Sequence, residues 1–235
     1  MATDRAVIPF EEALSRLEKD VLHLAELTVQ QFADAMCAIV TRDMKLGAQA
    51  VANGIVIDRY AVEATESAMQ LLALRQPGDL GLRQIIAASR ISADLRCIGD
   101  YAACIAERIG FLHRVSSERP IQIISQIGRR VQEMLEAVVH AYRRRDAAKA
   151  HEIWSEDREV DGIYRELLGE LRDLMVDGPR HICACTDILL IIESLECTGD
   201  HVRDIAEHTC YVVHGSHSSE APAKEDCPIQ LADKR

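Results

Sequence analysis

Apolar residues recur every three to four positions along most of this 235-residue chain, which is the period of an amphipathic α-helix. The pattern is clearest between residues 10 and 42, whose predicted core positions are Leu14, Leu17, Val21, Leu24, Thr28, Phe32, Ala35 and Ile39. Further helices are predicted over about 44–75, 80–113, 120–144, 147–176 and 180–213. The expected fold class is therefore all-α, with six long helices.

Polar and turn-forming segments separate these helices. Residues 41–43 and 143–146 are predicted corners, and the glycine- and proline-containing residues 76–79 and 177–179 are predicted breaks. Residues 116–120 form the best domain boundary. Short turns between long amphipathic helices predict antiparallel packing, and hence two tandem three-helix bundles. The expected domains are 1–115 and 116–214, followed by a polar, disordered tail over 215–235.

The two halves of the chain are an internal duplication. Segments 95–107 and 195–207 share residues at an offset of 100 positions: Leu, Cys, Gly, Asp, Ile, Ala and Glu recur at 95, 97, 99, 100, 105, 106 and 107 of the first half. Upstream, Asp43 and Asp58 match Asp146 and Asp161 at an offset of 103. The change of offset falls in the break after the second helix, where insertions are tolerated.

The final helix of the second half carries a row of acids. Glu196, Asp200, Asp204 and Glu207 are three or four positions apart, so they lie along one side of a helix. Four neighbouring carboxylates repel one another unless cations neutralise them. Two interpretations are open: a solvated helix face balanced by nearby arginines, or a site at which oxygen ligands bind a metal ion.

Composition and motifs limit the classes of function that this chain can have. A net charge of −11 disfavours nucleic-acid binding, which needs a basic face. No apolar run is long enough for a membrane span and the start of the chain has no signal-peptide core, so we expect a cytoplasmic protein with reduced thiols. Cys183 and Cys185 are interpreted as buried structural cysteines, with zinc binding as the alternative. The motifs of common enzyme classes are missing, and no enzymatic activity is expected.

The duplication and the order of these segments resemble the PhoU family of bacterial phosphate-signalling regulators. The resemblance spans about residues 10–214 and is carried by residues 27–31, 74–77, 98–102 and 156–161. It implies a cytoplasmic regulator that acts with the ATPase of the phosphate ABC transporter to hold the phosphate-sensing histidine kinase in its inhibitory state. It also implies iron, zinc or manganese, as divalent or trivalent ions, on acidic faces. The duplicated acidic surfaces further predict that metal promotes a homo-oligomer such as a dimer.

Carried over residue by residue, the resemblance predicts metal ligands mainly in the second repeat: Asp157, Asp161, Glu196, Asp200, Asp204 and Glu207. The first repeat is divergent, because Arg96 replaces the first acid of its motif and Cys104 replaces an amide. Its weaker candidate ligands are Asp58, Asp94, Asp100 and Glu107. Asp94, Asp100 and Glu107 are expected to pair with Arg96 and Arg90 instead. His201 and His208 are interpreted as surface histidines.

Two local features and two alternative functions also follow from the sequence. Tyr101 and Trp154 are expected to pack, and the basic run at 143–145 is expected to be a helix end, with a phosphate site as the alternative. A role in another transporter or in metal homeostasis is the alternative to phosphate control. A carboxylate-bridged metalloenzyme is less favoured, because bundle sites of that class use Glu-x-x-His pairs and this chain has none.

Overall fold

The computed structural model describes residues 9–74, 77–110, 119–155, 168–169, 171–173, 175–176 and 182–215. Within these ranges the chain is helical and contains no strand. The helices, in chain order, are α1 (Phe10–Thr41), α2 (Met44–Leu74), α3 (Asp79–Glu107), α4 (Arg119–Arg144), α5 (Ala147–Ser155) and α7 (Ile182–His214). The predicted all-α class is confirmed.

Most predicted helix bounds hold within two residues. The helix predicted over 80–113 was too long at its end: α3 stops at Glu107 and a 3₁₀ turn follows over 108–110, which includes the poor helix former Gly110. The helix predicted over 147–176 is described only as α5 and as short helical pieces at 168–169, 171–173 and 175–176. The domain boundary at 115/116 and the tail from residue 216 lie outside the described residues.

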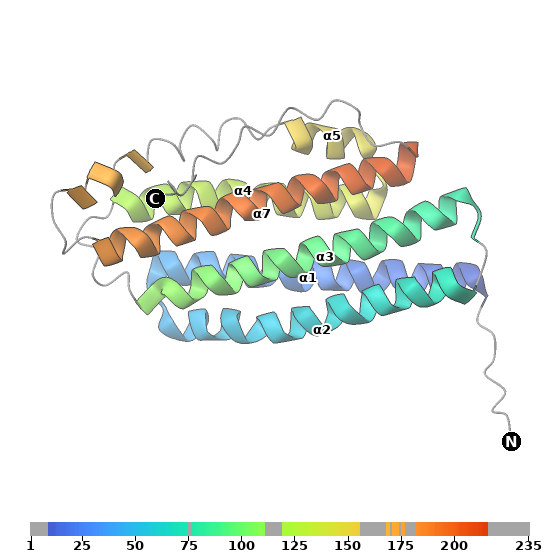
Figure 1. Ribbon diagram of the computed structural model, residues 1–235, viewed down its shortest axis with the longest axis horizontal. Helices are drawn as coiled ribbons and strands as arrows, with labels where there is room; N and C mark the ends of the chain where they lie inside the picture. Colours follow the sequence, from blue (N-terminus) through green and yellow to red (C-terminus); the bar gives the residue numbers. More distant parts are fainter. Residues whose placement is uncertain are drawn as a thin grey trace, which may run out of the picture.

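The two repeats share one hydrophobic core. Helices α1, α2 and α3 pack on one another, α4 and α5 pack with α7, and the repeats meet where α3 lies along α7 and α1 lies against α4 (Figure 1). The core cluster draws buried side chains from every labelled helix, for example Phe32, Ile57, Leu95, Leu135, Ile153 and Leu195. All eight core positions predicted for α1 are buried. Because α3 packs against both repeats, its sequence determines how they dock.

The two predicted corners have the same geometry, as an internal duplication requires. Arg42 and Arg145 follow α1 and α4 and both adopt left-handed backbone conformations, with φ of 57° and 53°. The next residue in each repeat caps the following helix. The Asp43 carboxylate accepts hydrogen bonds from the backbone N–H groups of Lys45 and Leu46, and Asp146 accepts one from Lys149. The corners therefore set α2 and α5 antiparallel to the preceding helices.

Candidate metal centre between the two repeats

The seam between α3 and α7 brings acidic and imidazole side chains of the two repeats together. The two helices run antiparallel (Figure 1), so Asp94 of α3 meets His201 of α7. Asp204 is three positions after His201 and four positions before His208, so all three residues lie on one side of α7. Neighbouring positions Val202, Ile205 and Ala206 are buried in the core and hold that side against α3.

The cluster is compact. Asp94 Oδ1 lies 3.0 Å from His201 Nδ1, and Asp94 Oδ2 lies 3.6 Å from His208 Nε2. One ligand atom from each of Asp94, His201 and Asp204 falls within 4.8 Å of the others. The side chains of Asp94 and His208 are only 13% and 12% exposed, whereas Asp204 lies at the exposed edge of the group. The site is therefore closed toward the core and open on one side.

Two polar atoms of this cluster are buried without a hydrogen-bond partner among the described residues: Oδ2 of Asp94 and Nδ1 of His208. Burial lowers the pKa of His208, while the Asp94 carboxylate acts in the opposite direction. Burying such groups unpaired costs free energy. Imidazole nitrogens and carboxylate oxygens are together a ligand set suited to a divalent transition metal. The residues of this seam thus fit a cation.

The structure separates the acids of the predicted row on α7. Asp204 joins Asp94 and His201, whereas Asp200 forms an ion pair with Arg203 one turn along the same helix. Successive residues four apart drift by about 40° around a helix, so Asp204 lies roughly 80° from Glu196 and closer to the histidines. Glu196 and Glu207 are partly buried along α7. Asp157 and Asp161 lie outside the described residues.

In the first repeat an arginine lies on the predicted acidic face. Arg96 forms an ion pair with Asp58 of α2, which places a fixed cation beside the predicted acidic face. Asp100 and Glu107 are exposed. The expectation that Asp94 pairs with Arg96 was wrong, since Arg96 pairs with Asp58 and Asp94 contacts His201. Residues two apart face nearly opposite sides of a helix, so Arg96 points to α2 while Asp94 points to α7.

The interpretation of His201 and His208 as surface histidines was also wrong, since their side chains are only 24% and 12% exposed and contact Asp94. The signal that sequence reasoning missed was their seven-residue spacing with an acid between them. Trp154 packs against the core and stacks on His151, as expected. Cys185 is buried as expected, but Cys183 is exposed.

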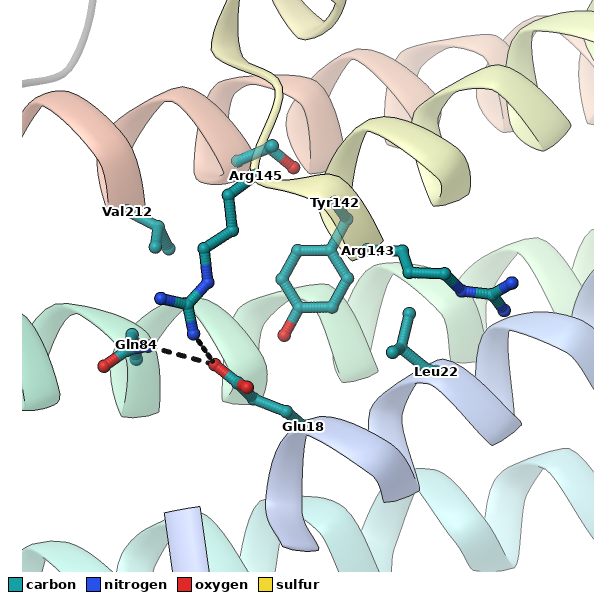
Figure 2. Close-up of a pocket in the computed structure, with 8 residues that line it drawn as sticks. Glu18, Leu22, Gln84, Tyr142, Arg143, Arg145 and Val212 are labelled. Atoms are coloured by element: carbon teal, nitrogen blue, oxygen red, sulfur yellow. Dashed lines mark hydrogen bonds and ion pairs between the residues drawn. The ribbon is translucent and has the colours of Figure 1, made fainter. Parts of the chain in front are cut away.

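A second junction between the repeats lies at the end of α4, where a pocket is lined by Glu18, Gln84, Tyr142 and Arg145 among others (Figure 2). Glu18 Oε1 accepts hydrogen bonds from Arg145, at 2.7 Å, and from Gln84, at 3.0 Å (Figure 2). Arg143 pairs with Glu26 of α1. Because the guanidinium groups at 143 and 145 already have carboxylate partners, this region holds α4 to α1.

Comparison with known proteins gives the same two-repeat organisation. The family model for the PhoU domain matches residues 21–109 and again residues 124–209. Together these matches cover well over half of the chain. The chain belongs to the PhoU family. This family consists of accessory and regulatory proteins and not of enzymes.

The similarity to individual PhoU proteins runs the length of the chain. A phosphate-specific transport system accessory protein PhoU homolog from Caulobacter vibrioides is 34% identical over 95% of this chain and 98% of that protein. A homolog from Zymomonas mobilis is 33% identical over 92% of each. The crystal structure of PhoU from Pseudomonas aeruginosa matches with a TM-score of 0.84 at 33% identity, covering 88% of this chain and all of that one.

A more distant crystal structure shares the fold as well. The phosphate transport system regulatory protein PhoU from Streptococcus pneumoniae matches with a TM-score of 0.79 at 26% identity and 90% coverage of this chain.

Among the described residues of the PhoU-family chain, no helix combines the length and apolarity that crossing a membrane requires. The chain is thus a PhoU-family regulator of phosphate transport whose two repeats meet at a His/Asp cluster.

Proposed function

We propose that this chain is a cytoplasmic regulator of phosphate uptake and of phosphate-responsive two-component signalling. In this proposal it contacts the sensor histidine kinase and the ATPase of the phosphate ABC transporter, and it restrains the kinase when phosphate is plentiful. The observation that carries the proposal is the full-length similarity to phosphate transport accessory proteins, with both repeats present.

The outer face of α2 supports regulation by protein contact. Ile55, Val62 and Met69 are seven positions apart and are 78%, 45% and 56% exposed, and Leu72 continues the same side of the helix. An exposed apolar stripe of this kind is typical of a protein interaction site. We assign this face to the kinase or the ATPase. A dimer of this chain through α2 is the alternative outcome of a test.

The experiment is a phosphate-response assay in the source organism. In a strain that lacks the gene, the response regulator should be phosphorylated in phosphate-rich medium, and the wild-type gene should restore the unphosphorylated state. Complementation with Ile55→Asp/Met69→Asp should fail, while Glu63→Gln on the same helix should succeed. If the deletion leaves the response regulator unphosphorylated at high phosphate, phosphate control is excluded. Light scattering of the variant then shows whether the face was a dimer contact.

The proposal includes a metal-binding acidic face in the second repeat, formed by Glu196, Asp200 and Glu207 with Asp157 and Asp161, and with Asp204 at its edge. Iron, zinc or manganese bound there would supply positive charge that neutralises the acids and links subunits into a dimer. Asp200 already forms an ion pair with Arg203, so a metal ion that binds Asp200 must displace that guanidinium. Metal content per chain should fall in Asp200→Ala and stay unchanged in Asp100→Ala. An equal metal content in wild type, Asp200→Ala and Asp100→Ala would contradict this part of the proposal.

A second candidate function follows from the first repeat. The Arg96–Asp58 ion pair closes the acidic face that the family motif would offer there. A chain altered in this way could serve as an adaptor for another transporter or in metal homeostasis. The deletion strain separates the two functions, because a defect in metal uptake with a normal phosphate response would favour the second.

A further inference from the structure

We propose that the seam between the two repeats is a specific binding site for one divalent transition-metal ion, with Asp94, His201 and Asp204 as ligands and His208 as the fourth. The ion would be zinc or a metal of similar preference. This site uses both repeats and differs from the acidic face of the second repeat proposed above, with which it shares only Asp204.

The geometry is close to what coordination needs. Zinc binds imidazole nitrogen and carboxylate oxygen at about 2.0–2.1 Å in a tetrahedron, so neighbouring ligand atoms stand about 3.3 Å apart. The three atoms of Asp94, His201 and Asp204 already fall within 4.8 Å of one another. Small side-chain rotations therefore bring these three ligands to bonding distance. His208 lies outside this group, but its Nε2 is 3.6 Å from Oδ2 of Asp94, so a larger movement of its ring would make it the fourth ligand.

The cluster also contains groups that the protein leaves unsatisfied. Oδ2 of Asp94 and Nδ1 of His208 are buried and have no hydrogen-bond partner among the described residues. The nearest donor to this Asp94 oxygen is His208 Nε2, at an ion-pair distance of 3.6 Å that is too long for a hydrogen bond, and a bound cation would give the oxygen a closer partner. Asp94 is only 13% exposed, so water compensates little for the missing partner. The His208 ring beside it is almost equally buried.

The opposite end of the same seam shows that packing does not demand this set of residues. At the offset of 100, Asp94, His201, Asp204 and His208 correspond to Ser194, Tyr101, Cys104 and Arg108. There the Ser194 hydroxyl donates to Cys104 Sγ at 3.4 Å, and Arg108 lies 2.9 Å from the same sulfur. The two ends of the α3–α7 contact therefore differ. One end is linked by ordinary hydrogen bonds, and the other end is composed of side chains that can bind a metal.

The ligand types select the class of ion. Two imidazoles and two carboxylates favour zinc, cobalt, iron(II) or manganese, whereas magnesium and calcium prefer sites made of oxygen alone. Since the ligands come from α3 and α7, binding would join the two repeats directly. An ion that binds only when the repeats are docked stabilises the docked state.

The test is a cobalt(II) and zinc titration of the full-length, chelator-treated protein, purified without a histidine tag. Wild type should bind one ion per chain at this site, with visible cobalt absorption bands of a tetrahedral nitrogen and oxygen site, and zinc should raise the Tm. Asp94→Asn and His201→Gln should each weaken binding at least about tenfold and remove the bands. Ser194→Ala, at the opposite end of the seam, and Asp200→Ala, on the acidic face, should keep them.

Three results would overturn the proposal. The first is a wild-type titration without tetrahedral bands. The second is sulfur-to-cobalt charge-transfer absorption, which would assign the ion to the cysteines. The third is binding that is lost in Asp200→Ala but kept in Asp94→Asn, which would place the ion on the acidic face alone. If Asp94→Asn does not fold, anomalous diffraction from zinc-soaked wild-type crystals decides the question, since density between Asp94 and His201 is required.

Discussion

The Asp94 carboxylate of α3 lies 3.0 Å from the His201 imidazole of α7, and this contact joins side chains 107 positions apart in the chain. Buried apolar side chains such as Leu95, Ile98, Val202 and Ile205 surround this contact, and the Ser194–Cys104 contact is a second polar link across the same seam. Apolar packing is tolerant of small sliding movements, whereas a hydrogen bond has a narrow range of distance. Asp94 and His201 therefore fix the register between the two repeats.

Removing this contact should destabilise the metal-free protein. Asp94→Ala leaves His201 and His208 without their carboxylate partner in a partly buried seam, and we expect a loss of about 1–3 kcal/mol in the free energy of unfolding. Asp100→Ala, at an exposed position of the same helix, should change it by less than about 0.5 kcal/mol. Urea unfolding in the presence of chelator measures both. Equal effects would show that Asp94 has no special structural role.

Two glycines of the first repeat should respond differently to alanine. A Cβ at Gly99 would stand 2.9 Å from Cγ2 of Ile57 and 3.1 Å from Oε1 of the buried Gln31, so Gly99→Ala should cost about 1–3 kcal/mol. At the partly buried Gly54 such a Cβ would come no closer than 3.5 Å to Nε2 of Gln31, which is an ordinary contact. Gly54→Ala should leave stability unchanged or raise it by up to about 1 kcal/mol through helix propensity. Thermal unfolding of both variants would test this; a more stable Gly99→Ala would contradict it.

The two corner aspartates should act as equivalent helix caps. Asp43→Ala and Asp146→Ala each remove the acceptor for backbone N–H groups at the start of α2 and α5, and each should cost about 1 kcal/mol. Asp43→Asn and Asp146→Asn keep an acceptor oxygen and should lose much less. Chemical denaturation of the four variants measures the effect. If the alanine and asparagine variants are equally stable, the side-chain oxygens do not cap.

Alkaline pH should destabilise the protein through Tyr142. Burial and the nearby Glu18 carboxylate raise the pKa of this phenol well above its usual value of about 10. The folded state then holds the proton more tightly than the unfolded state, so its stabilising contribution is complete below about pH 10 and is lost as the pH rises toward the folded pKa. Tm measured between about pH 8 and 11 should fall more steeply in wild type than in Tyr142→Phe. Parallel profiles would contradict the assignment.

The neighbouring thiols at 183 and 185 should differ in reactivity. Cys183 is exposed, whereas Cys185 is buried, and burial raises the pKa of the Cys185 thiol. Since the thiolate is the reactive form, iodoacetamide at pH 8 should modify Cys183 at least about tenfold faster. Mass spectrometry of a time course distinguishes the two positions within one peptide. In urea the two rates should become similar. Equal rates in the folded protein would contradict the burial of Cys185 and the exposure of Cys183.

Local features of this chain were predictable because the sequence determines them over a few residues. The helical period marked the core positions of α1, and the aspartates at 43 and 146 marked the helix starts, since capping needs only the adjacent backbone. The repeat was visible as identical residues at a fixed offset. Fold class and family followed from these features without any knowledge of long-range contacts.

The seam cluster could not be predicted, because it depends on how the repeats dock. Asp94 was grouped with Arg96 by proximity in the sequence, but the two residues face different helices. Asp204 was grouped with Asp200, although the drift of about 40° per four residues turns it toward the histidines. By itself, therefore, the sequence determined the helices, their caps and their duplication, all of which depend on local backbone and side-chain preferences. Only the antiparallel packing of α3 on α7 decided which acid meets which imidazole, because that choice depends on shape and burial across 107 residues.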